Sequence, residues 1–417
     1  MTTELFCRSC GSGDLQPILS LGMMPLTDAY VDPGAPGRSE PRYPLDLALC
    51  AECSLIQILH TVPPEEMFED YQYFSSFSDT LLAHSCEHAR RLVATRGLGP
   101  GSLVLEVASN DGYLLRYFLE AGVPVLGIDP AGGPADAAEA AGIPTLREYF
   151  GVELAERLIR EGRRADVLLA NNVLAHVPDL NGFVAGIAAV LGENGIAQIE
   201  VPYVKDLIEN LEFDTIYHEH LCYFSVTALR PLFARHGLSL NGVQHLEVHG
   251  GSLRLTVARE EDGDGSVDAY LEAEERAGMG GYEYYSLFAD RVEEVKSRLR
   301  KLLGSLREAG KRIAAYGAAA KGTILLNASG IAAPLVEYIV DRNPHKQGLL
   351  LPGVRLPIHD PSRLVEDRPD YVVILAWNIA DEIMAQQGAY RRAGGRFIVP
   401  IPSPTVVESG AASSTPT

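Results

Sequence analysis

The stretch that decides the fold is residues 102–118, "SLVLEVASNDGYLLRYF". Its apolar beginning ends near Glu106, a short turn with the letters "SNDG" follows, and the remainder has the apolar spacing of a helix. A second apolar run, "VPVLGIDP", ends in Asp129. This order of strand, turn, helix and strand predicts a βαβ unit, and so an α/β fold.

The polar residues of this unit also indicate what it binds. An acidic residue that closes the second strand, here Asp129, suits the two hydroxyl groups of a ribose. Ala108 and Asn110 stand where a dinucleotide-binding turn prefers glycine, and Gly112 follows them. A pyrophosphate over this turn is therefore disfavoured. A cofactor with a ribose and an amino-acid end, but no phosphate, fits better.

The α/β pattern continues along the chain. Residues 165–180, "ADVLLANNVLAHVPDL", predict a buried strand and then a polar loop with Asn171 and His176, and "NGIAQIEVPY" predicts another strand. Crevices in parallel sheets open at the carboxyl ends of the strands, where Glu106, Asp129, Asn171 and His176 all fall. A structural hydrogen bond is the alternative role for His176.

The C-terminal part repeats this organisation. Residues 311–327 again predict strand, glycine-rich turn and helix, and the next apolar run ends in Asp341. We therefore expect a second nucleotide-type domain. Backbone N–H groups at 317–322, together with Lys321, suit an anionic diphosphate, although such a turn can also serve packing alone. Residues 287–310 are charged and amphipathic, which predicts one long connecting helix.

Four cysteines lie in two tight pairs, "CRSC" and "CAEC", which contain Cys7, Cys10, Cys50 and Cys53. Two such knuckles can close tetrahedrally around Zn²⁺. Four thiolate ligands leave no open position for substrate or water, so the zinc is expected to be structural. A redox-active dithiol is the weaker alternative, because two matched pairs fit a zinc ribbon better.

Composition excludes several classes of protein. The chain has 417 residues, 47% of them hydrophobic, and can bury ordinary cores. No apolar run approaches the roughly 20 residues that span a bilayer, and no basic start precedes an apolar stretch. The formal net charge of −20 disfavours nucleic acid and anionic membranes. We expect a soluble cytoplasmic protein, with a monomer as the working oligomeric state.

The segment 216–224, "IYHEHLCYF", is dense in polar and aromatic side chains. In a regular strand His218 and His220 would point to one side, and Tyr217 and Glu219 to the other. Both pairs could not then face one substrate, so a loop or a bent strand end is expected. A His-x-His pair could chelate a metal, but no further His/Glu motif nearby offers a third ligand, which disfavours a metal here.

Several motifs together carry a family resemblance. They are "LEVASNDGYLL", "GIDPA", "NNVLAHVPD", "YHEHLCYFS", "HGGSLR" and "YGAAAKG", behind the double CxxC segment. With these motifs the sequence resembles the bacterial sugar C-methyltransferases, which use S-adenosylmethionine to methylate C-3 of dTDP-4-keto-deoxysugars. The resemblance runs from about Cys7 to about Pro402.

The resemblance implies three domains, one that binds zinc and two with an α/β fold. They are a zinc-ribbon-like domain at 1–66, a class I methyltransferase Rossmann-like domain at 67–286, and a second Rossmann-like domain at 287–405 that assists sugar-nucleotide binding. The low-complexity tail, 406–417, is expected to be disordered.

The resemblance also implies site residues. Those expected to line the methionine end of S-adenosylmethionine are Glu106, Ala108, Asn110 and Gly112, with Asp129 on the ribose and Asn171 near the sulfonium. The active-site tyrosine of the family falls on Tyr71, in the aromatic stretch 69–79. Candidate contacts to the dTDP-linked keto-deoxysugar are His249, Arg254, Tyr316 and Lys321. Residues 245–254 could equally form a hairpin.

Methylation of a carbon beside a ketone needs a base that forms an enolate and donors that stabilise its oxygen. We expect His220 to be the base, because histidine titrates near neutrality, with Tyr217 and Glu219 orienting base or substrate. His176 and Tyr71 complete the expected catalytic set, and His218 stays open between structure and function. The implied pathway is antibiotic deoxysugar biosynthesis. The alternatives are C-5, O- or N-methylation and a non-catalytic zinc-anchored binding module.

Overall fold

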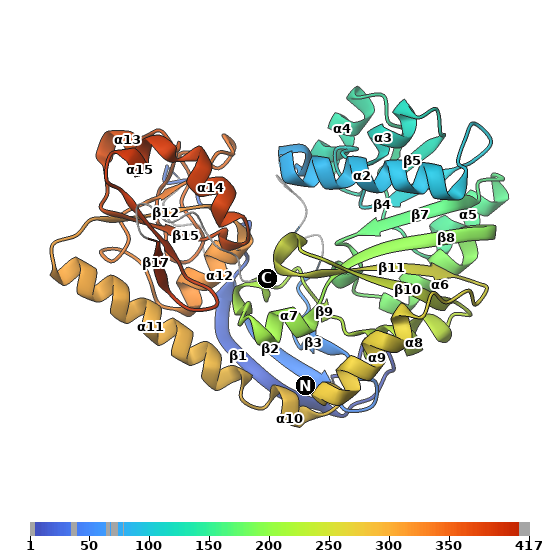
Figure 1. Cartoon of the computed structure of the whole chain (residues 1–417), viewed down its shortest axis with the longest axis horizontal. Coiled ribbons are helices and arrows are strands. Elements are labelled where there is room, and N and C mark those ends of the chain that lie inside the picture. Colours follow the sequence, from blue (N-terminus) through green and yellow to red (C-terminus); the bar gives the residue numbers. More distant parts are fainter. Residues whose placement is uncertain (1–4, 35–39, 64–66, 68–73, 78, 408–417) are drawn as a thin grey trace.

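The computed structural model describes residues 5–34, 40–63, 67, 74–77 and 79–407. Among these residues there are three sheets, with four, seven and six strands. Figure 1 shows two α/β domains side by side, with the N-terminal sheet and helix α11 running beneath them. The predicted α/β class with a small N-terminal domain is confirmed.

The N-terminal sheet has the strand order β1-β2-β3-β9 and is antiparallel. Its strands are β1 (Leu15–Pro25), β2 (Arg42–Cys50), β3 (Ile56–Ile58) and β9 (Cys222–Tyr223). The last strand comes from the middle of the chain, where it directly follows the polar segment 217–220. The zinc-binding part and the methyltransferase part therefore share a sheet.

The central sheet has the order β10-β11-β8-β7-β4-β5-β6, in which β11 alone runs antiparallel to the other strands. Its strands are β4 (Val104–Val107), β5 (Val125–Ile128), β6 (Thr145–Leu146), β7 (Ala165–Asn171), β8 (Leu191–Pro202), β10 (Ser239–Leu246) and β11 (Ser252–Ala258). The strand, turn and helix predicted for 102–118 are present. Residues 245–254 connect the β10–β11 hairpin, which was one of the two alternatives.

Helices cover both faces of this sheet, with α2, α3 and α4 on one side and α5, α6 and α8 on the other (Figure 1). The helices of this part of the chain, including two beyond those just named, are α2 (Asp79–Arg96), α3 (Leu115–Glu120), α4 (Gly132–Ala140), α5 (Val152–Arg160), α6 (Leu180–Val190), α7 (Val204–Glu209), α8 (Val226–Ala234) and α9 (Ser266–Ala277). The short 3-10 helices are η1 (Ser75–Phe77), η2 (Leu174–His176), η3 (Phe213–Thr215) and η4 (Val248–Gly250).

The predicted connecting helix is α11 (Phe288–Glu308), which follows α10 (Tyr282–Tyr285). It buries an apolar stripe that includes Val292, Leu299 and Leu303, at the spacing of one helix face. No helix in the described part of the chain combines the length and the apolarity that a bilayer crossing needs.

The C-terminal sheet has the order β14-β13-β12-β15-β16-β17. Its strands are β12 (Ile313–Tyr316), β13 (Ile339–Val340), β14 (Ile358–His359), β15 (Tyr371–Ile374), β16 (Arg396–Val399) and β17 (Thr405–Val407). Its helices are α12 (Ala320–Ala328), α13 (Arg363–Asp367), η5 (Trp377–Ile379), α14 (Ala380–Gln386) and α15 (Gly388–Arg392). Strand β17 takes in the first two residues of the segment 406–417, because it pairs with β16. The rest of that segment lies outside the described residues.

Candidate active site

The turn after β4 has an unusual backbone. Ala108, Asn110 and Gly112 have φ angles of 57°, 49° and 74°, in the left-handed region that most residues avoid. At Gly112 a Cβ atom would lie 2.1 Å from Cδ1 of Ile143, so only glycine fits. This strained turn lies at the carboxyl edge of the sheet, where strain is a feature of functional sites.

Asp129 holds this turn in place. Its Oδ2 accepts a hydrogen bond from the backbone N–H of Asn110 at 2.8 Å, and its Oδ1 accepts one from the N–H of Ala131 at 2.8 Å. Burial raises the pKa of the Asp129 carboxyl, and the two N–H groups oppose that rise. The expected ribose ligand is therefore also the clamp that shapes the turn.

Glu106 and Asn171 present buried polar atoms at the same edge. Glu106 is fully buried, and neither of its carboxyl oxygens has a hydrogen-bond partner among the described residues. Burial, followed by the charge of Asp129, raises its pKa well above the ordinary value. The Asn171 side-chain oxygen is also buried, with no hydrogen-bond partner in the part of the chain that the structure describes. Because buried polar groups are nearly always hydrogen-bonded, these atoms fit a cofactor that brings amine or hydroxyl donors.

Helix η1 lies against the strained turn. The backbone N–H of Ser75 donates to Oδ1 of Asn110 at 2.9 Å, and that of Ser76 donates to Oδ2 of Asp111 at 3.2 Å. The N-terminal side of this segment leads to Tyr71, which lies outside the described residues. Two hydrogen bonds therefore attach the stretch 74–77 to the strained turn.

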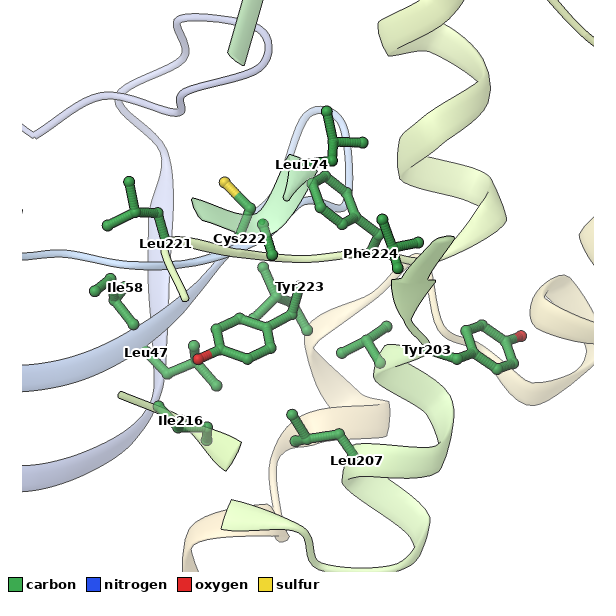
Figure 2. Close-up of a cluster of buried hydrophobic side chains, with 14 of the residues drawn as sticks. Leu47, Ile58, Leu174, Tyr203, Leu207, Ile216, Leu221, Cys222, Tyr223 and Phe224 are labelled. Carbon is green, nitrogen blue, oxygen red and sulfur yellow. The ribbon is translucent and has the colours of Figure 1, made fainter. Parts of the chain in front are cut away.

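The segment 217–220 forms a tight turn, as expected from its alternation of side chains. The backbone N–H of His220 donates to the carbonyl of Tyr217 at 2.9 Å. Ile216 and Leu221 flank the turn and are fully buried, beside Leu47 and Ile58 of the N-terminal sheet (Figure 2). These two buried residues fix both ends of the turn 217–220.

His220 is held at both ring nitrogens. Its Nδ1 lies 2.9 Å from the backbone carbonyl oxygen of Thr215, and its Nε2 lies 2.9 Å from the hydroxyl of Tyr217. A carbonyl only accepts, so Nδ1 carries the proton and Nε2 is the acceptor. A neutral imidazole with its acceptor electron pair on Nε2 has the protonation state that a general base requires.

His176 lies next to His220. The two rings are nearly perpendicular, with centroids 4.8 Å apart, and the backbone N–H of Leu221 donates to the carbonyl of Ala175 at 2.7 Å. Burial lowers the pKa of His176 to about 4, which keeps its imidazole neutral at neutral pH. The structure thus brings together His220, Tyr217 and His176 of the expected catalytic set.

Glu219 and His218 point elsewhere. The Thr27 hydroxyl donates to Oε1 of Glu219 at 2.9 Å. Burial, with the nearby charge of Asp28, raises the Glu219 pKa to about 8. Nε2 of His218 lies 3.3 Å from the carbonyl oxygen of Pro44, and burial lowers its pKa. Both side chains therefore contact the N-terminal part of the chain and not His220.

Arg254 lies on β11 within a buried polar cluster. Its Nε donates to Oε1 of Glu200 at 2.7 Å, and its Nη2 lies 2.9 Å from Nε2 of His84. Although burial raises the Glu200 pKa, His84 and the Arg254 charge lower it to about 2. Sequence reasoning had not singled out Glu200, His84 or His88. The spacing of the two histidines, four apart on α2, was the available signal, because such residues share a helix face.

The remaining predicted contacts lie elsewhere. His249 belongs to η4 and Tyr316 is a buried residue at the end of β12. The Lys321 ammonium lies 4.4 Å from the centre of the Trp377 indole and 3.4 Å from Oδ1 of Asn378. Burial lowers the pKa of Lys321.

The glycine-rich turn after β12 repeats the architecture of the cofactor turn. Asp341 accepts from the backbone N–H groups of Ala318 at 2.7 Å and Asn343 at 2.8 Å. Asp129 clamps its own turn in the same way. The predicted similarity between the two domains therefore includes a carboxylate in the same role, Asp129 in one and Asp341 in the other.

The four paired cysteines converge. The Sγ atoms of Cys7 and Cys53 are 3.5 Å apart, as are those of Cys10 and Cys50, and all four lie within 4.8 Å of one another. A tetrahedral site with Zn–S bonds of 2.3 Å needs sulfur atoms about 3.8 Å apart. The thiolates fit zinc, and with four protein ligands such a site is structural. Within the described part of the chain, no second group of potential metal ligands was found.

Known proteins resemble the chain along most of its length. A C-methyltransferase C-terminal domain matches residues 247–402, a zinc binding domain matches 7–68, and a methyltransferase domain matches 81–241. C-methyltransferase NovU of Streptomyces niveus is 36% identical over 406 residues, which cover 97% of each chain.

Partial relatives share the middle of the chain. A ubiquinone biosynthesis O-methyltransferase of Azorhizobium caulinodans is 31% identical over 119 residues, 28% of this chain and 46% of that one. Magnesium protoporphyrin IX methyltransferase from Synechocystis PCC 6803 superimposes with a TM-score of 0.36 and 16% identity, covering 46% of this chain and 90% of that chain.

The match to the methyltransferase domain agrees with the site. It covers β4 to β8, and the strained turn, Asp129 and Asn171 lie within that range. The chain is an enzyme with S-adenosylmethionine as its methyl donor and a structural zinc on four cysteines. Because the similarity to NovU spans almost the whole of both chains, this protein belongs to the family of C-methyltransferases with an N-terminal zinc-binding domain.

Proposed function

We propose that this protein methylates C-3 of a dTDP-linked 4-keto-deoxysugar, through an enolate that His220 forms. The observation that carries the proposal is the pair of hydrogen bonds at His220. With Nδ1 donating to the Thr215 carbonyl, Nε2 is left as a base beside the Tyr217 hydroxyl. A carbon nucleophile made by proton removal is what C-methylation requires and what O- or N-methylation does not.

The proton transfer follows from this geometry. Nε2 of His220 takes the proton from C-3, the electron pair of the C–H bond moves into the C-3 to C-4 double bond, and the C-4 carbonyl becomes an enolate oxygen. The hydroxyl of Tyr217, no longer bonded to Nε2, can donate to that oxygen. S-adenosylmethionine supplies the electrophilic methyl group. Substrate binding would therefore change the partner of the Tyr217 hydroxyl from Nε2 of His220 to the oxygen on C-4.

Other residues take supporting roles. Glu106, Ala108, Asn110 and Gly112 form the edge against which the methionine part of the cofactor would lie. Asp129 would hold its ribose, and Asn171 would lie near the sulfonium. These assignments rest on the strained turn and on the partnerless buried oxygens of Glu106 and Asn171.

The remaining candidates surround the sugar nucleotide. Neutral His176 would face the reacting centre from η2, and Tyr71 stays in the proposed catalytic set. Glu219 keeps its proton at neutral pH and orients the turn through Thr27. Candidate contacts to the sugar nucleotide are His249, Arg254, Tyr316 and Lys321. The methylated product is proposed to be a deoxysugar of an antibiotic.

The deciding experiment uses zinc-loaded protein, labelled S-adenosylmethionine and a panel of dTDP-4-keto sugars in deuterated buffer. The proposal expects a labelled sugar and deuterium exchange at C-3 that requires the enzyme. Exchange at C-5 would indicate methylation there, and methyl transfer without exchange would indicate an oxygen or nitrogen acceptor. Tight cofactor binding with no transfer to any sugar would favour a binding module.

A further inference from the structure

Helix η3 precedes the turn that carries His220, and its last residue supplies the hydrogen-bond acceptor for the base. The carbonyl oxygen of Thr215 lies 2.9 Å from Nδ1 of His220. Phe213 and Asp214 are fully buried, and Thr215 is nearly so. The position of the acceptor, and with it the proton on Nδ1, therefore depends on what packs against η3.

The C-terminal domain packs against η3. Helix α12 contacts it directly, and the indole N–H of Trp377 in η5 donates to Oδ2 of Asp214 at 2.8 Å. The other carboxyl oxygen, Oδ1, is buried without a hydrogen-bond partner among the described residues. One buried carboxylate thus joins the element next to the base to a domain that begins some 70 residues later in the chain.

Lys321 supports the same contact. Its ammonium lies 4.4 Å from the centre of the Trp377 ring and 3.4 Å from Oδ1 of Asn378. Burial raises the Asp214 pKa to about 6, and the positive charge of Lys321 opposes that rise. Glu212 is the other titratable group that acts on Asp214 and Lys321. Its pKa is raised to about 8, chiefly by burial.

We propose that Asp214 is a positioning residue for methyl transfer, and that Trp377 and Lys321 of the C-terminal domain hold it in place. The clamp fixes η3 so that the Thr215 carbonyl accepts from Nδ1 of His220 and Nε2 remains the nitrogen that can accept the substrate proton. The C-terminal domain then acts on the base as well as on the sugar nucleotide. This inference rests on the proposed function, because it assumes that His220 is the base.

The test compares Trp377→Phe, Asp214→Ala and Asp214→Asn in the full-length, zinc-loaded enzyme. Trp377→Phe and Asp214→Ala remove the donor or the acceptor, and kcat is expected to fall on the order of 10- to 100-fold, as for small misplacements of a catalytic group. Asp214→Asn keeps an amide oxygen that can accept from the indole N–H and should retain most of the activity. KM for the sugar nucleotide and Kd for S-adenosylmethionine should stay within about twofold, because neither Asp214 nor Trp377 is among the proposed contacts to either ligand.

Two controls separate positioning from general damage. Tyr390→Phe removes a buried hydroxyl that donates to the Pro369 carbonyl at 2.9 Å, elsewhere in the same domain, and should leave kcat unchanged. The second is the ¹⁵N–¹H spectrum of histidine-labelled protein, with the His220 signal assigned from its loss in His220→Asn. The wild type should show the Nδ1–H tautomer, and Trp377→Phe should show a mixture of tautomers.

The outcomes are distinguishable. If His220→Asn methylates the sugar at the wild-type rate, His220 is not the general base and the proposed function is overturned on that point. If that variant is inactive while Trp377→Phe and Asp214→Ala match the wild type, only the positioning role is overturned. A loss of kcat with an unchanged His220 tautomer also overturns it. If Asp214→Ala does not fold, Trp377→Phe against Asp214→Asn tests the same contact.

Discussion

The imidazole of His220 lies between a backbone carbonyl and a phenol: Nδ1 is 2.9 Å from the Thr215 oxygen, and Nε2 is 2.9 Å from the Tyr217 hydroxyl. This arrangement decides which nitrogen can accept a proton. It also places a hydroxyl that could stabilise an enolate oxygen directly beside the nitrogen proposed to form the enolate. The proposed base and this hydroxyl come from the two ends of one four-residue turn.

Replacing the base tests the first half of this relationship. His220→Asn is expected to lower kcat about 10²- to 10⁴-fold, the usual worth of a general base, and to abolish deuterium exchange at C-3. Binding of S-adenosylmethionine, measured by calorimetry, should be unchanged, because His220 is not among the residues of the strained turn. Full activity in this variant would show that another group removes the proton.

Replacing the phenol tests the second half. Tyr217→Phe keeps the ring, which packs against His220 with centroids 4.0 Å apart, and removes only the hydroxyl. We expect kcat to fall about 10²- to 10³-fold, as when one oxyanion donor is lost, with exchange slowed to the same extent. Tyr284→Phe is the matched control, since its hydroxyl donates to Glu209 and is not hydrogen-bonded to His220. Equal rates for both variants would remove Tyr217 from the mechanism.

Replacing Glu106 should increase the stability of the protein and weaken its binding of the cofactor. The Glu106 carboxyl is fully buried with no hydrogen-bond partner among the described residues, and such a group costs about 1–3 kcal/mol. Glu106→Met removes the polar atoms at similar volume. The cofactor-free variant should therefore gain about that much free energy of unfolding, measured with denaturant, while its Kd for S-adenosylmethionine rises. Unchanged affinity would contradict the assigned cofactor contact.

Acid stability should depend on His88. Burial, then the charge of Arg254, lowers its pKa from 6.5 to about 3. Its nearest carboxylate oxygen, on Glu200, is 3.6 Å away, too far for a hydrogen bond. Between pH 6.5 and about 3 the unfolded chain binds a proton at this residue that the folded chain does not. The free energy of unfolding should therefore fall as the pH falls through that window.

The matching variant is His88→Leu. Its stability advantage over the wild type should grow as the pH is lowered from 6.5 to 4.5, by up to about 1.4 kcal/mol per pH unit for one proton. Denaturant unfolding at several pH values measures this. The window stops at 4.5 because Glu200 begins to titrate in the unfolded chain there. A constant difference between the two proteins would mean that His88 is protonated in the folded state.

Zinc removal should affect activity as well as stability. Cys50 ends β2 and Cys53 follows it, and the sheet they support is completed by β9, which begins two residues after His220. Cys53→Ser, or treatment with a strong chelator, should abolish the bound zinc measured by metal analysis and lower the melting temperature. Methyl transfer should fall in parallel. Wild-type activity in fully zinc-free protein would show that β9 keeps its place without the metal.

Local patterns were sufficient for the elements that carry the cofactor site. The apolar run before Glu106, the turn after it and the strand that ends in Asp129 predicted β4, the strained turn and β5. Helix α11 followed in the same way from one amphipathic stretch. Such features depend on periodicity and turn chemistry within about a dozen residues, which a sequence displays directly.

Partners distant in the chain could not be predicted in that way. Nothing near Glu219 indicates that Thr27 donates to it, and nothing near Arg254 indicates Glu200 or His84. The alternation of residues 217–220 predicted a bend but not which side chains would meet across it. Each of these contacts depends on how separate elements dock, and that docking maximises apolar burial over the whole molecule.

The sequence by itself determined the chemistry available to this protein: four thiolates in two knuckles, an acidic residue after the second strand, and histidine with tyrosine in one short segment. Tertiary structure decided how that chemistry is arranged. It gave His220 the Thr215 carbonyl and left Nε2 as the acceptor. It also turned Glu219 and His218 towards the N-terminal part of the chain, and it joined Asp214 to Trp377. A proton's place on an imidazole depends on which atoms lie within hydrogen-bond distance, and only the folded chain brings those atoms together.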